Sequence, residues 1–158
     1  MIRKAKDAEH EQMVSIWLAA SIEAHDGVEP GFWRSQRRDM KEKYLPSAEN
    51  WVYVRDQAVL GFCSLQQNVL AALFVDPAHQ GEGIGSLLLE HAKSIESRLE
   101  LSVYSMNVRA VAFYERHGFG VMDERFDDMT GQWERSCIWI MTRQSRLDRR
   151  NRDGLSQL

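Results

Sequence analysis

The chain has 158 residues, of which 44% are hydrophobic and 27% charged, and its net charge at pH 7 is −3. This length predicts one domain with its own core, and the slightly acidic balance argues against nucleic acid as the main partner. The N-terminus is charged almost at once and no run of about 18 apolar residues occurs, so we expect no targeting segment and no membrane span.

The first half of the chain alternates between helical and extended patterns. We expect a short strand over residues 2–5 and a helix from Asp7 to His25, where apolar side chains recur at helical spacing. A glycine- and proline-containing segment then separates this helix from a second, charged helix over residues 32–45. Three strands with turns between them follow as an antiparallel meander, over Trp51–Arg55, Ala58–Gln66 and Val69–Val75.

The second half begins with an amphipathic helix over residues 84–95, preceded by a glycine-rich loop. We expect a strand from Leu99, a short helix from Asn107 to His117 and two final strands over residues 119–126 and 134–142. The order β-α-α-β-β-β-α-β-α-β-β predicts a mixed α+β fold over residues 1–142. Residues 143–158 carry five arginines and are expected to form a flexible tail.

The two cysteines indicate the redox environment of the protein. Cys63 and Cys137 both lie in apolar runs and have no spacing typical of a disulfide framework. We therefore expect buried, reduced thiols and a cytoplasmic location.

The loop Q-G-E-G-I-G, residues 80–85, has the composition of an anion site. Glycines allow a ligand to approach the backbone, and amides at a helix N-terminus point their N–H groups at an anion. A P-loop needs a lysine after Gly85, and a dinucleotide loop needs a glycine where Ser86 stands, so neither template fits. Without a lysine or an obvious metal site, backbone amides would neutralise most of the charge, which suits a diphosphate bound without a metal. Taken alone, the loop is equally compatible with a turn that binds nothing.

A second motif, N-x-x-A-x-x-F-Y-E-R-x-G-F over Asn107–Phe119, decides between these possibilities. Together with L-F-V-D-P-x-x-Q-G-x-G-I-G-x-x-L-L from Leu73, it closely resembles motifs A and B of the GNAT N-acetyltransferase superfamily. The resemblance is close over Leu73–Phe119 and looser over residues 1–142, and it does not cover the tail. It implies the GNAT acyl-CoA N-acyltransferase fold with a splayed central sheet. The chain as a whole looks like a member of a small bacterial branch of single-domain acetyltransferases.

The resemblance implies transfer of an acetyl group from acetyl-CoA to a primary amine. Amides of the loop would bind the pyrophosphate. The strand before the loop, which carries a bulge in this family, would pair with pantetheine. Two residues of the second motif would line the opposite wall of the cofactor slot. The implied cofactor-binding residues are Leu73, Phe74, Val75, Gln80, Gly81, Glu82, Gly83, Ile84, Gly85, Ser86, Asn107 and Phe113.

Tyr114 is the residue to which the resemblance assigns chemistry. Attack of an amine on a thioester gives a tetrahedral intermediate that must expel a thiolate. A phenol keeps its proton at neutral pH and can donate it to that sulfur. The oxyanion of the intermediate would be met by a strand amide, that of Phe74 or Val75.

The general base and the acceptor are less defined in the sequence. Because no Asp or Glu occurs between Asp56 and Asp76, a carboxylate on the strand before the loop is excluded. His25 is a candidate, with His79 and Glu29 as weaker ones, and a water relay or a neutral amine would also serve. Phe32 and Trp33 are candidates for the acceptor-site wall or for the core.

Two hypotheses follow from these patterns. In the first, the protein is an acetyl-CoA-dependent N-acetyltransferase acting on a protein lysine, a protein N-terminus or a small amine, as a monomer or homodimer. In the second, it is an acyl-CoA-binding sensor or interaction module without turnover. Tyr114 favours the enzyme, and the absence of a strand carboxylate leaves room for the sensor.

Overall fold

The structure of the protein is a computed structural model that describes residues 1–156. Its strands are β1 (Ile2–Lys4), β2 (Glu49–Arg55), β3 (Ala58–Gln66), β4 (Val69–Val75), β5 (Arg98–Tyr104), β6 (Gly120–Asp127) and β7 (Gln132–Ile140). They form one seven-stranded sheet in the order β1-β2-β3-β4-β5-β7-β6. Only β4 and β5 are parallel neighbours, so the expected antiparallel meander and mixed α+β fold are confirmed.

The helices are α1 (His10–Ala24), α2 (Pro30–Ser35), α3 (Arg37–Asp39), α4 (Ile84–Ile95), α5 (Val108–Arg116) and α6 (Arg143–Ser156). The second expected helix is divided into α2, α3 and a π-helical turn over Met40–Tyr44. It starts at Pro30, because proline is favourable at the first helical position, and the π-helical turn ends at Tyr44, although Leu45 before Pro46 still has helical backbone angles. No helix within residues 1–156 combines the length and apolar character needed to cross a membrane.

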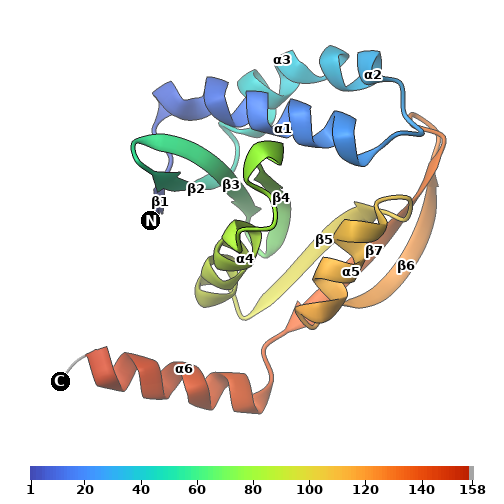
Figure 1. Cartoon of the computed structure of the whole chain (residues 1–158). Helices are drawn as coiled ribbons and strands as arrows, with labels where there is room; N and C mark the ends of the chain where they lie inside the picture. Colours follow the sequence, from blue (N-terminus) through green and yellow to red (C-terminus); the bar gives the residue numbers. More distant parts are fainter. Residues whose placement is uncertain (157–158) are drawn as a thin grey trace.

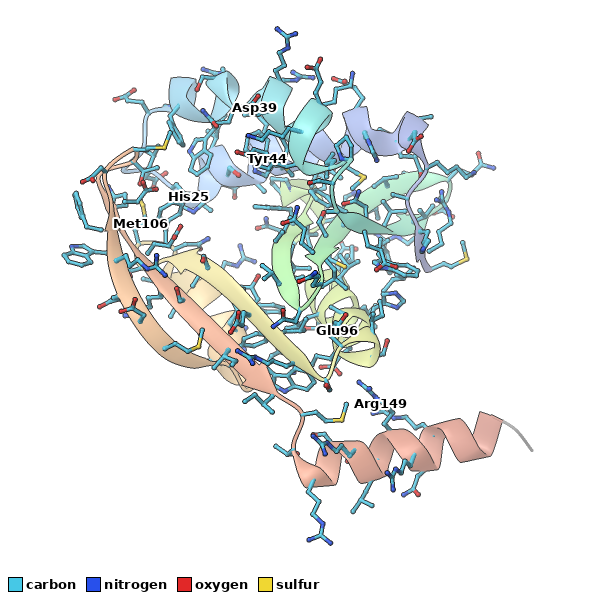
Figure 2. The ribbon with its side chains drawn as sticks, turned by 180° about the vertical axis from the view of Figure 1, so that it is seen from behind. His25, Asp39, Tyr44, Glu96, Met106 and Arg149 are labelled. Atoms are coloured by element: carbon cyan, nitrogen blue, oxygen red, sulfur yellow. The ribbon has the colours of Figure 1, made fainter. Side chains whose placement is uncertain are left out.

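Two helical layers cover different parts of the sheet (Figure 1). On one face, α1 and α2 bury Val14 and Trp33 in a cluster that includes Phe62 of β3. On the other face, α4 buries Leu88 and Leu89 against the sheet, and α5 covers β5. Figure 2, from behind, shows β5, β7 and β6 with no helix of the described chain over their near side. One half of the sheet is therefore covered on both faces and the other half on one.

Cys63 and Cys137 are buried and unbonded, as expected. Burial raises the pKa of the Cys63 thiol to about 12. Such a thiol is protonated at neutral pH and is therefore a packing residue, not a nucleophile.

The sheet opens between β4 and β5, as the splayed architecture requires. The two strands are paired only at Val69 and Glu100, where the Glu100 amide donates to the Asn68 carbonyl at 2.9 Å. The β3–β4 register shifts at Ser64/Leu65, which places the additional bulge residue, Ala71, in β4. Beyond the single pair, the edge of β4 faces the opening.

The antiparallel register decides which β4 backbone groups face that opening. The Asp76 amide donates to the Leu60 carbonyl at 2.8 Å. Because hydrogen-bonded pairs alternate along such a ladder, Phe74 is bonded to β3 through Phe62. The backbone groups of Leu73 and Val75 therefore point to the opening.

The C-terminal tail is helical over its described part. The helix α6 stands apart from the body at the lower edge of the molecule (Figures 1 and 2), and the Arg149 guanidinium donates to the Lys93 carbonyl at the end of α4. Helicity does not test mobility, so the expected flexibility of residues 143–158 stays a prediction. Residues 157–158 lie outside the described residues.

Glu9 fixes β1 to the start of α1. Its carboxylate accepts two hydrogen bonds from Arg3, at 2.8 and 2.7 Å, and one from the Lys6 amide at 2.8 Å. The Arg3 guanidinium is the main reason why the pKa of Glu9 falls from 4.5 to about 2. Because the folded-state pKa is the lower one, the stabilisation is complete above pH 4.5 and is lost as the pH falls toward 2.

We therefore expect Glu9→Gln to be destabilised relative to the wild type at pH 7, and this difference to shrink at pH 3. Urea unfolding of both proteins at the two pH values measures it. Glu23→Gln, on the exposed side of α1, is the control and should change little at either pH. A Glu9→Gln difference that is equal at pH 7 and pH 3 contradicts the role of the carboxylate charge.

Candidate active site

The glycine-rich loop leads into α4 with its amides unpaired. Gly81 and Gly83 have positive φ values of 82° and 84°, and a Cβ built at either would meet no atom within 4 Å. Gly83 is the N-cap of α4, and the first amide bonded within the helix is that of Leu87, which donates to the Gly83 carbonyl at 3.1 Å. The amides of residues 84–86 are thus free to bind an anion in open space.

A cavity of about 350 Å³ joins this loop to the open edge of β4 and to α5. It brings together almost all the residues expected to bind the cofactor: Leu73, Phe74, Val75, Gln80, Gly81, Gly83, Ile84, Gly85, Ser86, Asn107 and Phe113. The exception is Glu82, whose carboxylate instead pairs with Arg55 at 2.8 Å and His79 at 3.0 Å. At Glu82, therefore, the backbone amide and not the side chain is the group expected to bind the cofactor.

Two wall residues also have structural partners. The Asn107 side chain caps α5 by accepting from the Ala110 amide at 3.2 Å. Phe113 stacks on His117 with ring centroids 4.6 Å apart, and its ring lies 3.6 Å from a Cβ built on Gly85. The ring of Phe113 therefore packs beside the loop at Gly85.

Tyr114 lies in the same cavity, on α5. Its ring packs edge-on against Phe113 at 5.2 Å and Phe119 at 5.5 Å. Burial raises the pKa of its phenol above the ordinary value, so the hydroxyl remains protonated at neutral pH. It makes no hydrogen bond to another residue of the described chain and can donate to a bound ligand.

Two arginines at the cavity add side-chain cations to the backbone amides that were expected to neutralise the phosphate charge. Arg109 and Arg116 both line the cavity, and Arg109 also donates to the Gln80 side chain at 3.0 Å. Neither arginine follows the glycines directly in the sequence, so the loop motif alone does not reveal them. Their spacing of seven residues on a predicted helix, which places them on one face, is the signal that could have found them.

The register also changes the expected oxyanion donor. The Phe74 amide is bonded to β3, so it cannot meet an oxyanion in the opening. The amides of Val75, which was expected, and Leu73, which was not, face the opening. Gln80 additionally donates to the Val75 carbonyl at 3.3 Å.

A second cavity, of about 290 Å³, lies on the other side of β4. Its walls are uncharged and include several aromatic side chains. The lining residues are Trp17, Phe32, Trp33, Gln36, Met40, Tyr44, Leu45, Ala48, Ser64, Gln66, Ala71, Ala72, Phe74 and Tyr104. Phe74 lines both cavities, so the two are neighbours on either side of this residue. Phe32 and Trp33 line this cavity and also pack with the core, and their role in the acceptor-site wall stays a prediction.

The candidates for the general base are not brought together. His25 is buried between Trp33 and Tyr104, with its Nδ1 2.7 Å from the Ser21 carbonyl, and lines neither cavity. Burial lowers the pKa of His25, which keeps it neutral. His79 lines the first cavity but is paired with Glu82, and Glu29 is exposed at the start of α2.

Comparison with known proteins identifies the family. Residues 46–121 match the model of the Acetyltransferase (GNAT) domain. The chain is 33% identical to peptidyl-lysine N-acetyltransferase YiaC of Escherichia coli over 143 residues, which cover 90% of this chain and 95% of YiaC. The chain belongs to the GNAT acetyltransferase family.

Solved structures agree with this assignment. Apo YjaB from Escherichia coli superposes on this GNAT protein with a TM-score of 0.79 and 30% identity, over 90% of this chain and 98% of YjaB. PaiA N-acetyltransferase from Thermoplasma acidophilum, solved in complex with coenzyme A, has the same fold at 22% identity, with a TM-score of 0.71 over 85% of this chain and 96% of PaiA. The protein is an acetyl-CoA-dependent N-acetyltransferase, and these relatives do not favour the module without turnover.

Proposed function

We propose that this GNAT acetyltransferase transfers the acetyl group of acetyl-CoA to lysine side chains of proteins. YiaC, which matches nearly the whole chain, is named a peptidyl-lysine N-acetyltransferase. The observation that carries the proposal is that two neighbouring cavities share Phe74. One is lined by the glycine-rich loop and Tyr114, and the other is uncharged and contains several aromatic side chains.

The first cavity supports a binding mode for acetyl-CoA along β4. The free amides of residues 84–86 and the guanidinium groups of Arg109 and Arg116 would bind the anionic pyrophosphate of the cosubstrate. The backbone groups of Leu73 and Val75 would pair with the amides of pantetheine, as an added strand does. The thioester would then lie in the opening beside Tyr114.

Tyr114 would act as the general acid. The neutral amine attacks the thioester carbonyl carbon, a C–N bond forms, and the oxyanion accepts a hydrogen bond from the Leu73 or Val75 amide. The C–S bond then breaks, the phenol gives its proton to the departing sulfur, and the ammonium proton of the product returns to the phenol or to water. Burial keeps the phenol protonated for this step.

The remaining parts of the proposal concern the protein in the cell. Residues 1–142 would form the catalytic domain, with residues 143–158 as an appended segment. We propose a cytoplasmic enzyme that works as a monomer or homodimer and needs no metal, nucleic acid or membrane. Among residues 1–156 no group of three or more His, Cys, Asp and Glu side chains could hold a metal ion.

An acceptor screen tests the proposal. The protein is incubated with acetyl-CoA and lysine-containing peptides, the same peptides with acetyl-lysine, N-terminal amines or small amines, and thiol release is followed. We expect release with free lysine peptides, and mass spectrometry should place the acetyl group on the lysine Nε. Transfer confined to small amines or N-termini would contradict the assignment to protein lysines.

A further inference from the structure

The uncovered face of β5, β7 and β6 adjoins the aromatic cavity. Tyr104, at the end of β5, lines that cavity and packs against His25 and Trp33. In the β5–β7 register Tyr104 is directly opposite Glu134. Because directly opposed residues of antiparallel strands point to the same face, Glu134 lies on the same face of the sheet as Tyr104 and next to it, and so beside a residue that lines the cavity. Figure 2 shows no helix of the described chain over this face of β5, β7 and β6.

Most carboxylates on this face are already paired. Glu100 is bonded to Arg98, Asp123 pairs with Arg125 at 3.4 Å, and Asp127 accepts from the Tyr104 hydroxyl at 2.6 Å and from Thr130 at 3.1 Å. Glu134 makes no ion pair or hydrogen bond within the described part of the chain. Its opposite residue in β6 is Arg125, whose guanidinium is the one paired with Asp123.

Glu134 is also partly removed from water. Its side chain is half-buried, and its pKa is raised, first by burial and then by the neighbouring Asp127, against a smaller lowering by Arg125. A half-buried carboxylate without a cation is an unfavourable arrangement that a bound cation would relieve. Such a residue beside a cavity is a candidate for ligand recognition.

We propose that Glu134 binds the ammonium group of the incoming acceptor and so selects cationic amines at the entrance to the aromatic cavity. This inference rests on the proposed function, since it describes the acceptor side of the same site. The aromatic walls would pack the methylene stem of a lysine and attract its charge. The carboxylate would supply the specific, charge-assisted hydrogen bond. The ammonium ion would then lose one proton to water, and the resulting neutral amine would attack the thioester.

The test compares steady-state kinetics of Glu134→Gln, Glu134→Asp and Glu100→Gln. Glu100→Gln is the matched control, because Glu100 lies on the same face but at the closed end of the β4–β5 opening. For Glu134→Gln we expect KM for the peptide to rise about ten-fold or more, with kcat and KM for acetyl-CoA within about two-fold of the wild type. Glu134→Asp, which keeps the charge, should recover part of the loss, and the control should match the wild type.

The outcomes separate this inference from the proposed function. If the wild type acetylates small cationic amines but no peptide, the proposed function fails, and the same variants are tested with that amine. An unchanged acceptor KM in Glu134→Gln, or a fall in kcat without a change in KM, overturns the inference and leaves the acetyltransferase activity intact. Equal losses in Glu134→Gln and Glu100→Gln also overturn it, and thermal unfolding shows whether each variant is folded.

Discussion

Tyr114→Phe should bind acetyl-CoA normally and transfer its acetyl group at least about ten-fold more slowly, because positioned proton donors contribute roughly 10²–10⁴-fold. The substitution removes only the hydroxyl, and that hydroxyl makes no hydrogen bond within residues 1–156, so the fold should lose little stability. The phenylalanine ring can keep the edge-on contacts with Phe113 and Phe119. Calorimetry for acetyl-CoA binding and single-turnover kinetics for transfer measure the two effects separately.

Tyr53→Phe is the matched control for this substitution. Tyr53 is a partly buried tyrosine on β2 that packs against the same core cluster but lines neither cavity. It should leave both binding and transfer unchanged. If Tyr114→Phe transfers acetyl groups as fast as the wild type, Tyr114 is not the acid, and protonation of the thiolate by water becomes the better account.

Gly83→Val should abolish measurable binding of acetyl-CoA. Gly83 adopts a φ of 84°, which a β-branched residue strongly disfavours, and it is the N-cap that aims the free amides of α4. A valine side chain there would also occupy the open space in front of the loop, where a Cβ meets no protein atom. Either effect displaces the amides from the pyrophosphate, and calorimetry measures the lost affinity.

Gly131→Val separates backbone strain from loss of the anion site. Gly131, in the turn between β6 and β7, has a φ of 71° and equally open space around its Cβ position. This control should lose stability, as Gly83→Val should, and keep its affinity for acetyl-CoA. Normal affinity in a folded Gly83→Val protein would mean that the loop is a turn and not a phosphate cradle.

The elements with a strong local pattern were predictable from the sequence, and those set by tertiary packing were not. The amphipathic pattern places α4 over Ile84–Ile95, as in the structure. The π-helical turn at Met40–Tyr44 has no such pattern, because it arises where Met40 and Leu45 both reach the core. The helix α6 was not expected, since an arginine-rich segment has no apolar face to fix its conformation.

The candidate site also contains features that the sequence predicts and features that depend on tertiary structure. Gln80, Gly83 and Tyr114 follow from contiguous motifs, and the structure gathers them around one cavity. The direction of the Leu73 amide, toward the opening between β4 and β5, depends instead on the register of β4 against β3. The partial burial of Glu134 depends on a strand pairing between segments far apart in the chain, which no local pattern encodes.

The opening between β4 and β5 would couple the stability of the fold to the cosubstrate bound there. The two halves of the sheet share a single pair of residues at one end of these strands, so an acetyl-CoA molecule paired with Leu73 and Val75 would act as the missing strand between them. By linkage, cosubstrate at about 100 times its dissociation constant adds about 2.7 kcal/mol to the free energy of unfolding. When acetyl-CoA is scarce, the enzyme would therefore lose resistance to proteolysis together with its substrate, so that its abundance and its turnover would fall together.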